Sequence, residues 1–450
     1  MIFETLDAAP NFLALNERLP KRYPFLLESV DRDTRLSRHD ILFHASERSL
    51  ILDHQGQLFR DGVEVSDSDF LSELDHCWSE ERCEVSASDL PFHGGWFVFL
   101  SYELAALAEP TLDLPAANSS FPRAFAVRCH GALIRDHASG RCLAVVEPGH
   151  EELLGEIQAD AERAAAWIIP DCPPHHQVNE ESPQRFVRSL AKIHRYIIDG
   201  DVFQVNISRK WRIPSSASHG AVFAALRRHN PAPFAAIARW QESAVISSSP
   251  ERLLESRHGW VQTRPIAGTR PRDPRRVDDQ LRRNDLISHP KERAEHIMLI
   301  DLERNDLGRV CIPGSVEVDE LMVVESYAHV HHIVSNVRGR LREGASPGEV
   351  IKAVFPGGTI TGCPKVRCME IIAEMESEGR GPYTGSLGYL NRDGSMDLNI
   401  LIRTLLCEGG AIVFRAGAGI VADSVVQHEL AETRSKAKGL LLALDPEYTS

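Results

Sequence analysis

Two pairs of glutamates, far apart in the chain, have a spacing that suits metal-ion chemistry. One pair lies in PKERAEHIMLIDLERNDLGRV (290–310) and the other in ELAETRSK (429–436). Residues three apart share one face of a helix, so each pair would present two carboxylates together. Two such helices could bind a hard cation, with Mg²⁺ the default, although each pair could equally be a solvated acidic face. The four residues are Glu292, Glu295, Glu429 and Glu432.

The segment FPGGTITGCPK (355–365) has the composition of an anion-binding loop. It ends where the helical pattern KVRCMEIIAEME begins, and backbone N–H groups at a helix N-terminus can bind phosphate or carboxylate. It lacks the G-x-x-x-x-G-K-[ST] spacing of a nucleotide-binding loop. The small-residue stretch AGAG (416–419) could also bring backbone amides to an anion, or could be a tight turn between strands. These segments favour a small anionic substrate over a nucleotide.

Two further polar features call for partners. Arg403 lies in the apolar strand pattern NILIRT, where an unpaired charge is costly, so we expect an anionic partner from the protein or the substrate. His331 and His332 are adjacent in VHHIVS. Successive side chains of a strand point to opposite faces, so at most one of these histidines should enter a given pocket.

Composition restricts the class of protein. The chain has 450 residues and a net charge of −14, which makes nucleic acid a poor partner. Its nine cysteines form no C-x-x-C, which argues against a disulfide framework or a zinc site and for a reducing cytosol. We find no signal peptide and no uninterrupted run of 18 apolar residues. A cytoplasmic enzyme without a membrane partner is the expectation.

The elements that must position these residues fall on two sides of a Pro-rich segment, 170–184. Before it, the pattern predicts short strands, a hairpin over 130–147 and an amphipathic helix over 151–169. After it, a helix over 182–201 precedes alternating strands and helices, which is typical of an α/β (α+β) fold. The predicted domains are residues 1–175 and 182–445.

The order of the motifs resembles the chorismate-utilising enzymes, specifically the synthase subunits of aminodeoxychorismate synthase and anthranilate synthase. The resemblance covers almost all of residues 185–440 and implies a large two-layer fold whose β-sheets form a sandwich-like core flanked by helices. The matching stretches are GDVFQVNISR (200–209), SSPERLL (248–254), RPIAGTRPR (264–272), KERAEHIMLIDLERNDLGRV (291–310), VHHIVS (330–335), FPGGTITGCPKVRCMEII (355–372), YTGSLGYL (383–390), MDLNILIRT (396–404) and AGAGIVADSVVQHELAETRSKA (416–437).

The resemblance implies a ligand set for Mg²⁺ and for chorismate. Glu295 and Glu432 would bind Mg²⁺ directly, and Glu292 and Glu429 directly or through water. The ion would bridge to the ring carboxylate of chorismate and neutralise its charge. Further residues would hold the two carboxylates of chorismate, with Lys436 close to the metal-bound one: Gly268, Thr359, Tyr383, Arg403, Gly417, Ala418 and Gly419.

The resemblance also implies catalytic roles. Glu251 would protonate the departing 4-hydroxyl, which requires a raised pKa, and His332 rather than His331 matches the active-site histidine, with Thr269 in the same set. Relatives that add water carry a lysine base where this chain has Gln204, so the glutamine indicates the branch that uses ammonia. Some aminodeoxychorismate synthases carry a lysine nucleophile where this chain has Ala267, so that adduct cannot form at this position.

The expected partners follow from the same resemblance. A separate glutamine amidotransferase subunit would supply ammonia, and the product would be 4-amino-4-deoxychorismate, used by a downstream aminodeoxychorismate lyase, or anthranilate. The stretches QVNIS and NPAPFAA look more like aminodeoxychorismate synthase. In the N-terminal part, FLLES resembles the tryptophan-binding motif of anthranilate synthases, which also persists in the other branch. The residues concerned are Leu27, Glu28 and Ser29.

Overall fold

In the computed structural model, one continuous antiparallel sheet runs through the whole chain. The structure describes every residue except 8, 32–36, 84–88, 274, 327–329 and 449–450, and it does not describe the side chain of residue 291. Among the helices of the described residues, we find none that combines the length and the apolar character needed to cross a membrane. All nine cysteines are free thiols, as the scattered spacing predicts.

The strands divide between the two sides of the Pro-rich segment. Those up to residue 180 are β1 (Ile2–Thr5), β2 (Phe25–Glu28), β3 (His39–Leu52), β4 (Leu58–Arg60), β5 (Val63–Glu64), β6 (Gly95–Leu100), β7 (Ala124–Asp136), β8 (Arg141–Val146) and β9 (Asn179–Glu180). The later strands are β10 (Gln204–Pro214), β11 (Phe234–Trp240), β12 (Ser243–Ser249), β13 (Arg252–Arg257), β14 (Trp260–Thr263), β15 (Ile266–Pro271), β16 (Glu317–Ser326), β17 (Val330–Arg340), β18 (Gly362–Cys363), β19 (Ser386–Asn391), β20 (Met396–Asn399), β21 (Thr404–Glu408) and β22 (Ala411–Ile420).

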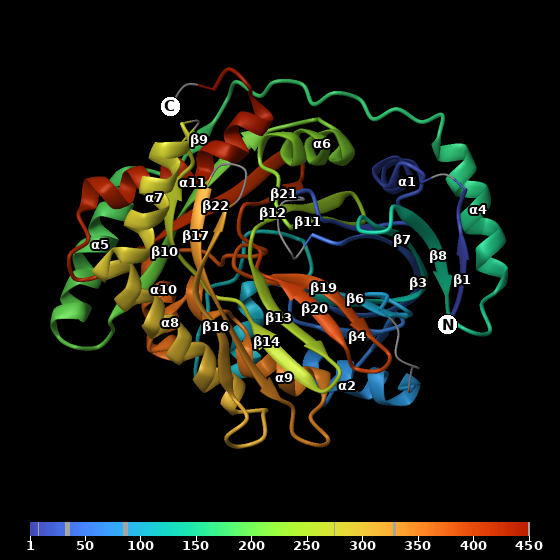
Figure 1. The fold of residues 1–450 in the computed structure, drawn as a ribbon, viewed down its shortest axis with the longest axis horizontal. Coiled ribbons are helices and arrows are strands. Elements are labelled where there is room, and N and C mark those ends of the chain that lie inside the picture. Colours follow the sequence, from blue (N-terminus) through green and yellow to red (C-terminus); the bar gives the residue numbers. More distant parts are fainter. Residues whose placement is uncertain (8, 32–36, 84–88, 274, 327–329, 449–450) are drawn as a thin grey trace.

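The helices lie around this sheet, and α5, α7, α8, α10 and α11 gather on one flank, at the left of Figure 1. The α-helices are α1 (Phe12–Arg18), α2 (Phe70–Glu81), α3 (Ala105–Ala108), α4 (Glu152–Ala164), α5 (Pro183–Ile198), α6 (His219–His229), α7 (Arg276–Ser288), α8 (Pro290–Gly308), α9 (Pro347–Val354), α10 (Lys365–Met375) and α11 (Val426–Leu444). Two 3₁₀ helices are η1 (Tyr102–Leu104) and η2 (Gly358–Ile360).

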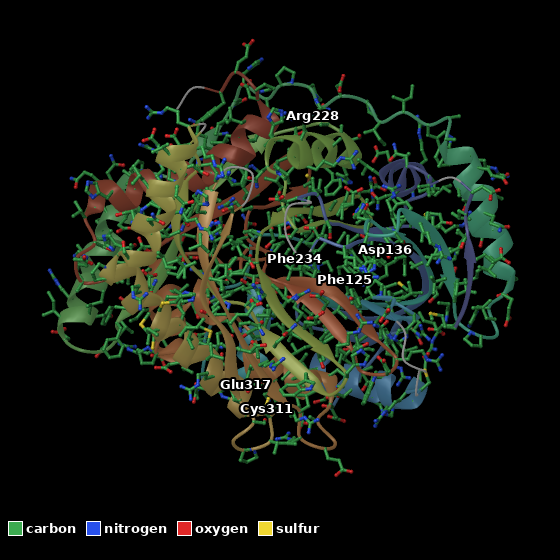
Figure 2. The ribbon with its side chains drawn as sticks, viewed as in Figure 1. Phe125, Asp136, Arg228, Phe234, Cys311 and Glu317 are labelled. Carbon is green, nitrogen blue, oxygen red and sulfur yellow. The ribbon has the colours of Figure 1, made fainter. Side chains whose placement is uncertain are left out.

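The sheet has two long arms that meet where β3 pairs with β7. One arm runs β3–β2–β11–β12–β21–β22–β10, and the other runs β7–β6–β19–β20–β13–β14–β17. An aromatic cluster with members from both arms fills the interior, and it includes Phe125, labelled in Figure 2. The mixed α/β class and the sandwich-like core with flanking helices are therefore confirmed.

The two predicted domains share this sheet. Strand β2 pairs with β11, and β6 pairs with β19, so strands from residues 1–175 complete the sheet of residues 182–445. The connection between α4 and α5 runs over the top of the molecule in Figure 1. The division into two domains stays a prediction, since strands from both sides of the predicted boundary pair in one hydrogen-bonded sheet.

The sequence patterns predicted the hairpin and the helix before the Pro-rich segment, with small errors at the ends of the helix. The hairpin over 130–147 is β7 with β8, whose last pair is Asp136 and Arg141. The helix predicted over 151–169 ends earlier, at Ala164. Strand β12 ends at Ser249 and β13 begins at Arg252, and this break places Glu251 between two strands.

Stacked phenylalanine rings connect the arms of the sheet. The ring centroids of Phe25 on β2 and Phe97 on β6 are 4.1 Å apart and their planes differ by 3°. Both side chains are almost fully buried, at 1% and 0% exposure. Because these strands pair with β11 and β19, this contact links the N-terminal strands to both arms.

We expect Phe97→Ala to lower the free energy of unfolding by about 3–5 kcal/mol, because it leaves a cavity in the aromatic interior. Urea denaturation followed by circular dichroism measures the loss. Phe3→Ala is the matched control, since Phe3 on β1 is 50% exposed. An equal loss in the two variants would contradict the assignment of this contact to the core.

Candidate functional site

The pairing of β10 with β22 forms the base of the candidate site. Ten residue pairs hold the two strands in register, with Asn206 opposite Gly419 and Ser208 opposite Gly417. Side chains alternate along a strand, so Gln204 and Asn206 point to the same face of β10. The stretch 416–419 therefore lies inside a strand, and the expectation of a turn there was wrong.

The small residues of β22 make room for polar side chains. A Cβ at Gly419 would lie 2.4 Å from Nε2 of Gln204, and one at Gly417 would lie 2.7 Å from the Tyr383 hydroxyl. Strand β21 pairs with β22 only up to Phe414. On that side, residues 416–419 have no strand neighbour among the described residues, so their backbone can face a ligand.

Three buried polar side-chain atoms lie on β10 or beside Thr359, which the Asn206 amide contacts and which lowers the pKa of Glu251. They are Oε1 of Gln204, Oδ1 of Asn206 and Oε1 of Glu251, none of which has a hydrogen-bond partner among the described residues. Gln204 instead uses Nε2, which donates to Oε1 of Glu295 on α8 at 2.9 Å. Buried polar groups nearly always have partners, so this cluster of unpaired atoms indicates a binding site.

Glu251, at the break between β12 and β13, is the acid of this cluster. Burial raises its pKa to about 7, the nearby Thr359 hydroxyl lowers it, and the carboxylate of Glu303 raises it. A carboxyl group with such a pKa can carry a proton at neutral pH and release it during a reaction. The proton-donor role that the family resemblance implies for Glu251 requires a raised pKa, and burial is the main cause of the increase.

Strand β17 places the adjacent histidines in different surroundings. Nε2 of His331 lies 2.8 Å from Asp279 of α7, whereas Nδ1 of His332 lies 3.0 Å from the Thr269 hydroxyl and 3.2 Å from the Gly268 carbonyl. Burial, aided by the charge of Arg403, lowers the pKa of His332 to about 4. Its imidazole is therefore neutral near pH 7 and can exchange hydrogen bonds without carrying charge.

A β-bulge in β15 lies between His332 of β17 and Glu292 of α8. The register with β17 shifts between Ala267 and Thr269, and Gly268 at the bulge has a φ of +65°. A Cβ there would lie 2.8 Å from Oε2 of Glu292, so both the backbone conformation and the close carboxylate require glycine. Ala267 is buried on the same strand at 7% exposure.

Arg403 lies directly before β21 with a φ of +53°, and its side chain is close to Glu251. Burial lowers the pKa of Arg403, and the Glu251 carboxyl is the charge that opposes this effect. Glu251 is thus a carboxyl close enough to act on the charge of Arg403, and the sequence expectation of an anionic partner from the protein or the substrate stays a prediction.

The four glutamates occupy helices α8 and α11, as their spacing predicts. Nη1 of Arg270 lies 3.0 Å from Oε1 of Glu292, and Nζ of Lys436 lies 2.7 Å from Oε1 of Glu432. No three of the four have carboxylate oxygens that all lie within 4.8 Å of one another. Their donor chemistry still fits a hard cation, since all four offer carboxylate oxygens.

A different cluster meets that distance criterion and could hold a metal ion. His130, Glu147 and His150 have ligand atoms within 4.8 Å of one another. Here Glu147 already pairs with Arg128 at 2.7 Å and Arg392 at 3.3 Å, and the two imidazole rings stack at 3.9 Å. These contacts explain the cluster without a cation.

Sequence reasoning missed Glu303. This side chain is 5% exposed on α8, and burial together with the Asp306 carboxylate raises its pKa to about 7. The signal was present, because Glu303 lies on the same helical stripe as the buried His296, Ile300 and Leu307. An acid on an apolar stripe indicates a specific environment.

The motif FLLES has its own set of partners. Glu28 accepts from Nη1 of Arg227 at 3.0 and 3.1 Å, and the Ser29 amide donates to Oδ1 of Asp40 at 3.0 Å. Leu27 pairs with Ala236 of β11, one strand away from β12 and Glu251. These polar groups are engaged within the protein and belong to a separate region of the sheet.

Comparisons with known proteins match this architecture. The family described as chorismate binding enzyme matches residues 24–442. An "Anthranilate synthase component I-like protein" of Synechocystis is 40% identical over 84% of this chain and 78% of its own. "Aminodeoxychorismate synthase component 1" of Bacillus subtilis is 38% identical over 82% and 81%. The crystal structure of anthranilate synthase component I from Streptococcus pneumoniae is 31% identical, with a TM-score of 0.81 and coverage of 90% and 92%.

We expect the Glu251→Gln variant to gain stability relative to the wild type as pH rises. A folded-state pKa of about 7 means that the folded protein binds a proton more tightly than the unfolded chain. The stabilisation of the folded state by this proton is complete below the unfolded pKa of about 4.5, and it is lost as the pH rises through 7. One pKa unit corresponds to 1.36 kcal/mol. The free energy of unfolding of Glu251→Gln minus that of the wild type should therefore rise by about 2–3 kcal/mol between pH 5 and pH 8.

Urea denaturation at a series of pH values measures this difference. The exposed Glu47→Gln makes the same substitution outside the buried site and serves as the control. A flat profile for Glu251→Gln would mean that Glu251 titrates as an ordinary surface acid.

Proposed function

Because the chain belongs to the chorismate binding enzyme family, we propose that it is an aminodeoxychorismate synthase component 1. In this proposal it replaces the 4-hydroxyl of chorismate with the nitrogen of ammonia, and the 4-amino-4-deoxychorismate formed serves p-aminobenzoate and folate synthesis. Gln204, whose neutral amide donates to Glu295, carries the amination part of the proposal, and the stretches QVNIS and NPAPFAA favour aminodeoxychorismate as the product. A glutamine cannot act as a general base, and ammonia does not need one because it is already a nucleophile.

The proposed substrate site uses the groups around the β10–β22 base. The carboxylates of chorismate would be held by the guanidinium of Arg403, the hydroxyls of Thr359 and Tyr383, and the open backbone of Gly417, Ala418 and Gly419. Lys436 supplies a second positive charge beside Glu432. Burial raises the pKa of Tyr383 to about 12, so its hydroxyl stays protonated and can donate.

The proposed reaction needs one proton donor. As the new C–N bond forms, the C–O bond to the 4-hydroxyl breaks, and Glu251 gives its proton so that water leaves. The ammonium group formed then returns a proton to the carboxylate, which restores the acid. The neutral His332, hydrogen-bonded to Thr269 and the Gly268 carbonyl, orients the ring of the substrate.

We further propose that Mg²⁺ binds at Glu295 and Glu432, with Glu292 and Glu429 as direct or water-mediated ligands. When bound, the ion neutralises and orients the ring carboxylate of chorismate. Gln204 and Arg270 hold two of these carboxylates in place through hydrogen bonds at 2.9 and 3.0 Å. Gly268 leaves room for Glu292 to reach the site.

The partners of this activity are part of the proposal. The term component 1 in the names of relatives implies a component 2, which would be a glutamine amidotransferase subunit that supplies ammonia. An aminodeoxychorismate lyase would use the product. The action would take place in the cytoplasm.

Anthranilate synthase component 1 is the alternative, in which pyruvate also leaves. Relatives of both kinds have similar identity, and the solved structure from Streptococcus pneumoniae is of the anthranilate type. Ala267 offers no lysine nucleophile, and Leu27, Glu28 and Ser29 keep a tryptophan-site-like motif. Glu28 forms an ion pair with Arg227. A role of this motif in binding tryptophan is proposed only for the anthranilate synthase alternative.

The product identifies the branch. Purified chain with chorismate, MgCl₂ and an ammonium salt at alkaline pH should form an amino-chorismate that aminodeoxychorismate lyase converts to p-aminobenzoate, detected by chromatography. Fluorescent anthranilate formed without the lyase would contradict the first assignment and support the alternative.

Glu295→Ala and Glu432→Ala should each lower kcat/KM by at least about 100-fold, because each removes a proposed ligand that fixes the substrate. Initial rates across a Mg²⁺ series measure the effect, and the exposed Glu343→Ala should behave as wild type. Full activity of the Glu432 variant without any requirement for Mg²⁺ would exclude α11 from the metal site.

A further inference from the structure

Arg380 is a buried cation that the proposed reaction does not use. It follows α10, and its side chain is 1% exposed. Nε donates to Oε2 of Glu376 at 3.0 Å, and Nη2 donates to Oε1 of Glu376 at 2.8 Å. This bidentate pair has the geometry that arginine forms with a carboxylate and lysine cannot.

The remaining N–H groups of Arg380 reach three segments that carry proposed substrate-binding residues. Nη2 donates to the Asn206 carbonyl at 2.8 Å, two residues after Gln204. Nη1 donates to the Ile360 carbonyl, next to Thr359, and to the Thr384 hydroxyl, both at 3.3 Å. A guanidinium has five N–H donors, and all five therefore have partners.

The rings of two tyrosines enclose the same guanidinium. Its carbon lies 4.8 Å from the ring centroid of Tyr102 and 5.5 Å from that of Tyr383. The Thr384 hydroxyl, which accepts from Arg380, also donates to the Tyr383 carbonyl at 2.5 Å. The position of Tyr383 thus depends on Arg380 through its ring and through its backbone.

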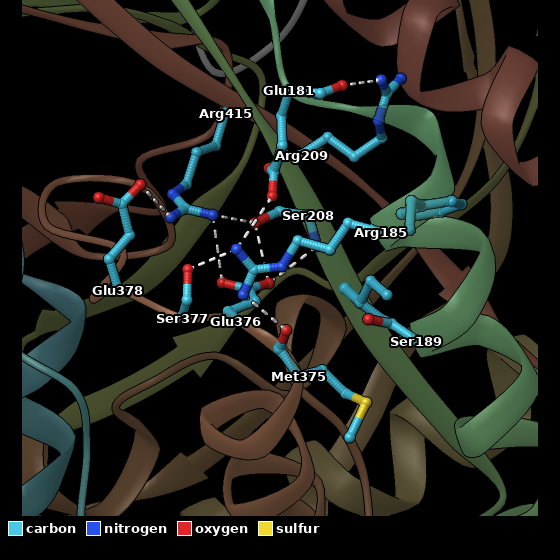
Figure 3. A pocket seen from close by; sticks show the side chains of 12 residues that line it. Glu181, Arg185, Ser189, Ser208, Arg209, Met375, Glu376, Ser377, Glu378 and Arg415 are labelled. Atoms are coloured by element: carbon cyan, nitrogen blue, oxygen red, sulfur yellow. Dashed lines mark hydrogen bonds and ion pairs between the residues drawn. The ribbon is translucent and has the colours of Figure 1, made fainter.

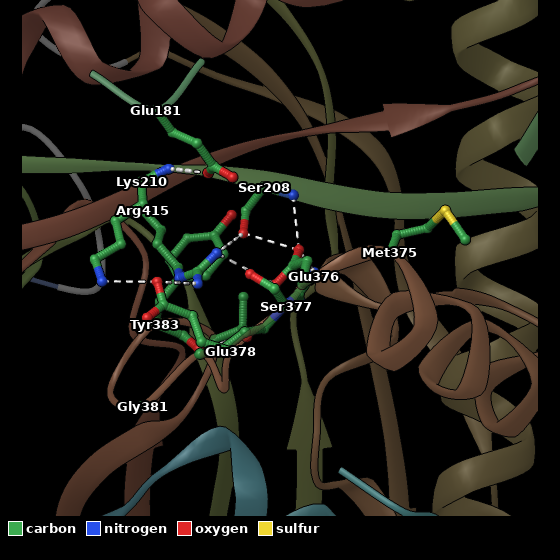
Figure 4. Close-up of polar contacts among 12 residues, drawn as sticks. Glu181, Ser208, Lys210, Met375, Glu376, Ser377, Glu378, Gly381, Tyr383 and Arg415 are labelled. Atoms are coloured by element: carbon green, nitrogen blue, oxygen red, sulfur yellow. Dashed lines mark hydrogen bonds and ion pairs between the residues drawn. The ribbon is translucent and has the colours of Figure 1, made fainter. Parts of the chain in front are cut away.

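Glu376 anchors this arrangement from its other side. Its Oε1 accepts from the backbone and the hydroxyl of Ser208 at 2.8 and 2.9 Å, and Arg415 lies 3.4 Å from Oε2. Figures 3 and 4 show Arg415 between Glu376 and Glu378. Arg415 also donates to the Ser208 hydroxyl and to Glu378, and among the described residues its side chain forms no hydrogen bond with Asn206, Ile360 or Tyr383.

We propose that Arg380 is a positioning residue for chorismate, which holds the segments of Gln204, Thr359 and Tyr383 in the relative placement that binds the substrate. The proposal rests on the proposed function, since it takes these segments as the chorismate site. A single rigid planar group joins β10, the 3₁₀ helix η2 and the segment before β19. Strand β10 and the segment around η2 also contact each other directly, and Arg380 ties the segment of Tyr383 to both.

Arg380→Lys keeps the charge beside Glu376 but provides three donors on a flexible stem, so the three segments lose their common contact. Arg415→Lys is the matched control, because it makes the same change at the same carboxylate while its hydrogen bonds go to Ser208, Glu376 and Glu378 and not to Asn206, Ile360 or Thr384. If Arg380 only neutralises Glu376, the two variants should behave alike.

We expect Arg380→Lys to raise the KM for chorismate and its dissociation constant by about 10- to 100-fold, the loss typical of a misplaced binding group. Arg415→Lys should stay within about two-fold of wild type. Initial rates with ammonium give KM and kcat, and isothermal titration with chorismate and MgCl₂, without ammonium, gives the dissociation constant. Thermal unfolding of both variants measures their loss of stability.

Equal KM and dissociation constants in the two lysine variants would overturn the proposal. If Arg380→Lys does not fold, Thr384→Val removes one of its bonds without changing charge, and an unchanged dissociation constant in that variant would overturn the proposal instead. A wild type that binds chorismate without forming an aminated product contradicts the proposed function, while the titration still tests Arg380.

Discussion

The antiparallel pairing of β10 with β22 is the constraint on which the site depends. Its register puts Gln204 and Asn206 beside glycines of the neighbouring strand, where a Cβ at Gly417 or Gly419 would collide with their side chains. Because side chains alternate along a strand, a shift of one residue would turn both into the opposite face. The ten pairs of this ladder therefore fix the chemistry of the site as well as its shape.

Burial of charge is the second organising effect. Glu251 and Glu303 both have pKa values raised to about 7 by burial, and Arg403 has its pKa lowered by the same cause. Because the two acids can stay neutral near pH 7 while the arginine carries a positive charge, these three groups together favour the binding of an anion. The buried Glu376, by contrast, is neutralised by two arginines, Arg380 and Arg415.

Sequence patterns predicted the elements that have local signals. The glutamate pairs at 292–295 and 429–432 lie on helices, and the hairpin over 130–147 is present, because helical spacing and turn residues act over short distances. The shared sheet was not predictable, since the pairing of β2 with β11 joins segments about two hundred residues apart. Arg380 was missed for the same reason, because its partners come from three distant segments.

The unpaired atoms of Gln204, Asn206 and Glu251 have a thermodynamic consequence. A buried polar group that lacks a hydrogen-bond partner costs about 1–3 kcal/mol in general, so a ligand that bonds to these atoms relieves such a cost. A ligand that supplies these bonds binds the folded state only, and it must raise the free energy of unfolding by mass action. Binding and stability are therefore coupled here through the same three atoms, and the fold is most stable when the site is occupied.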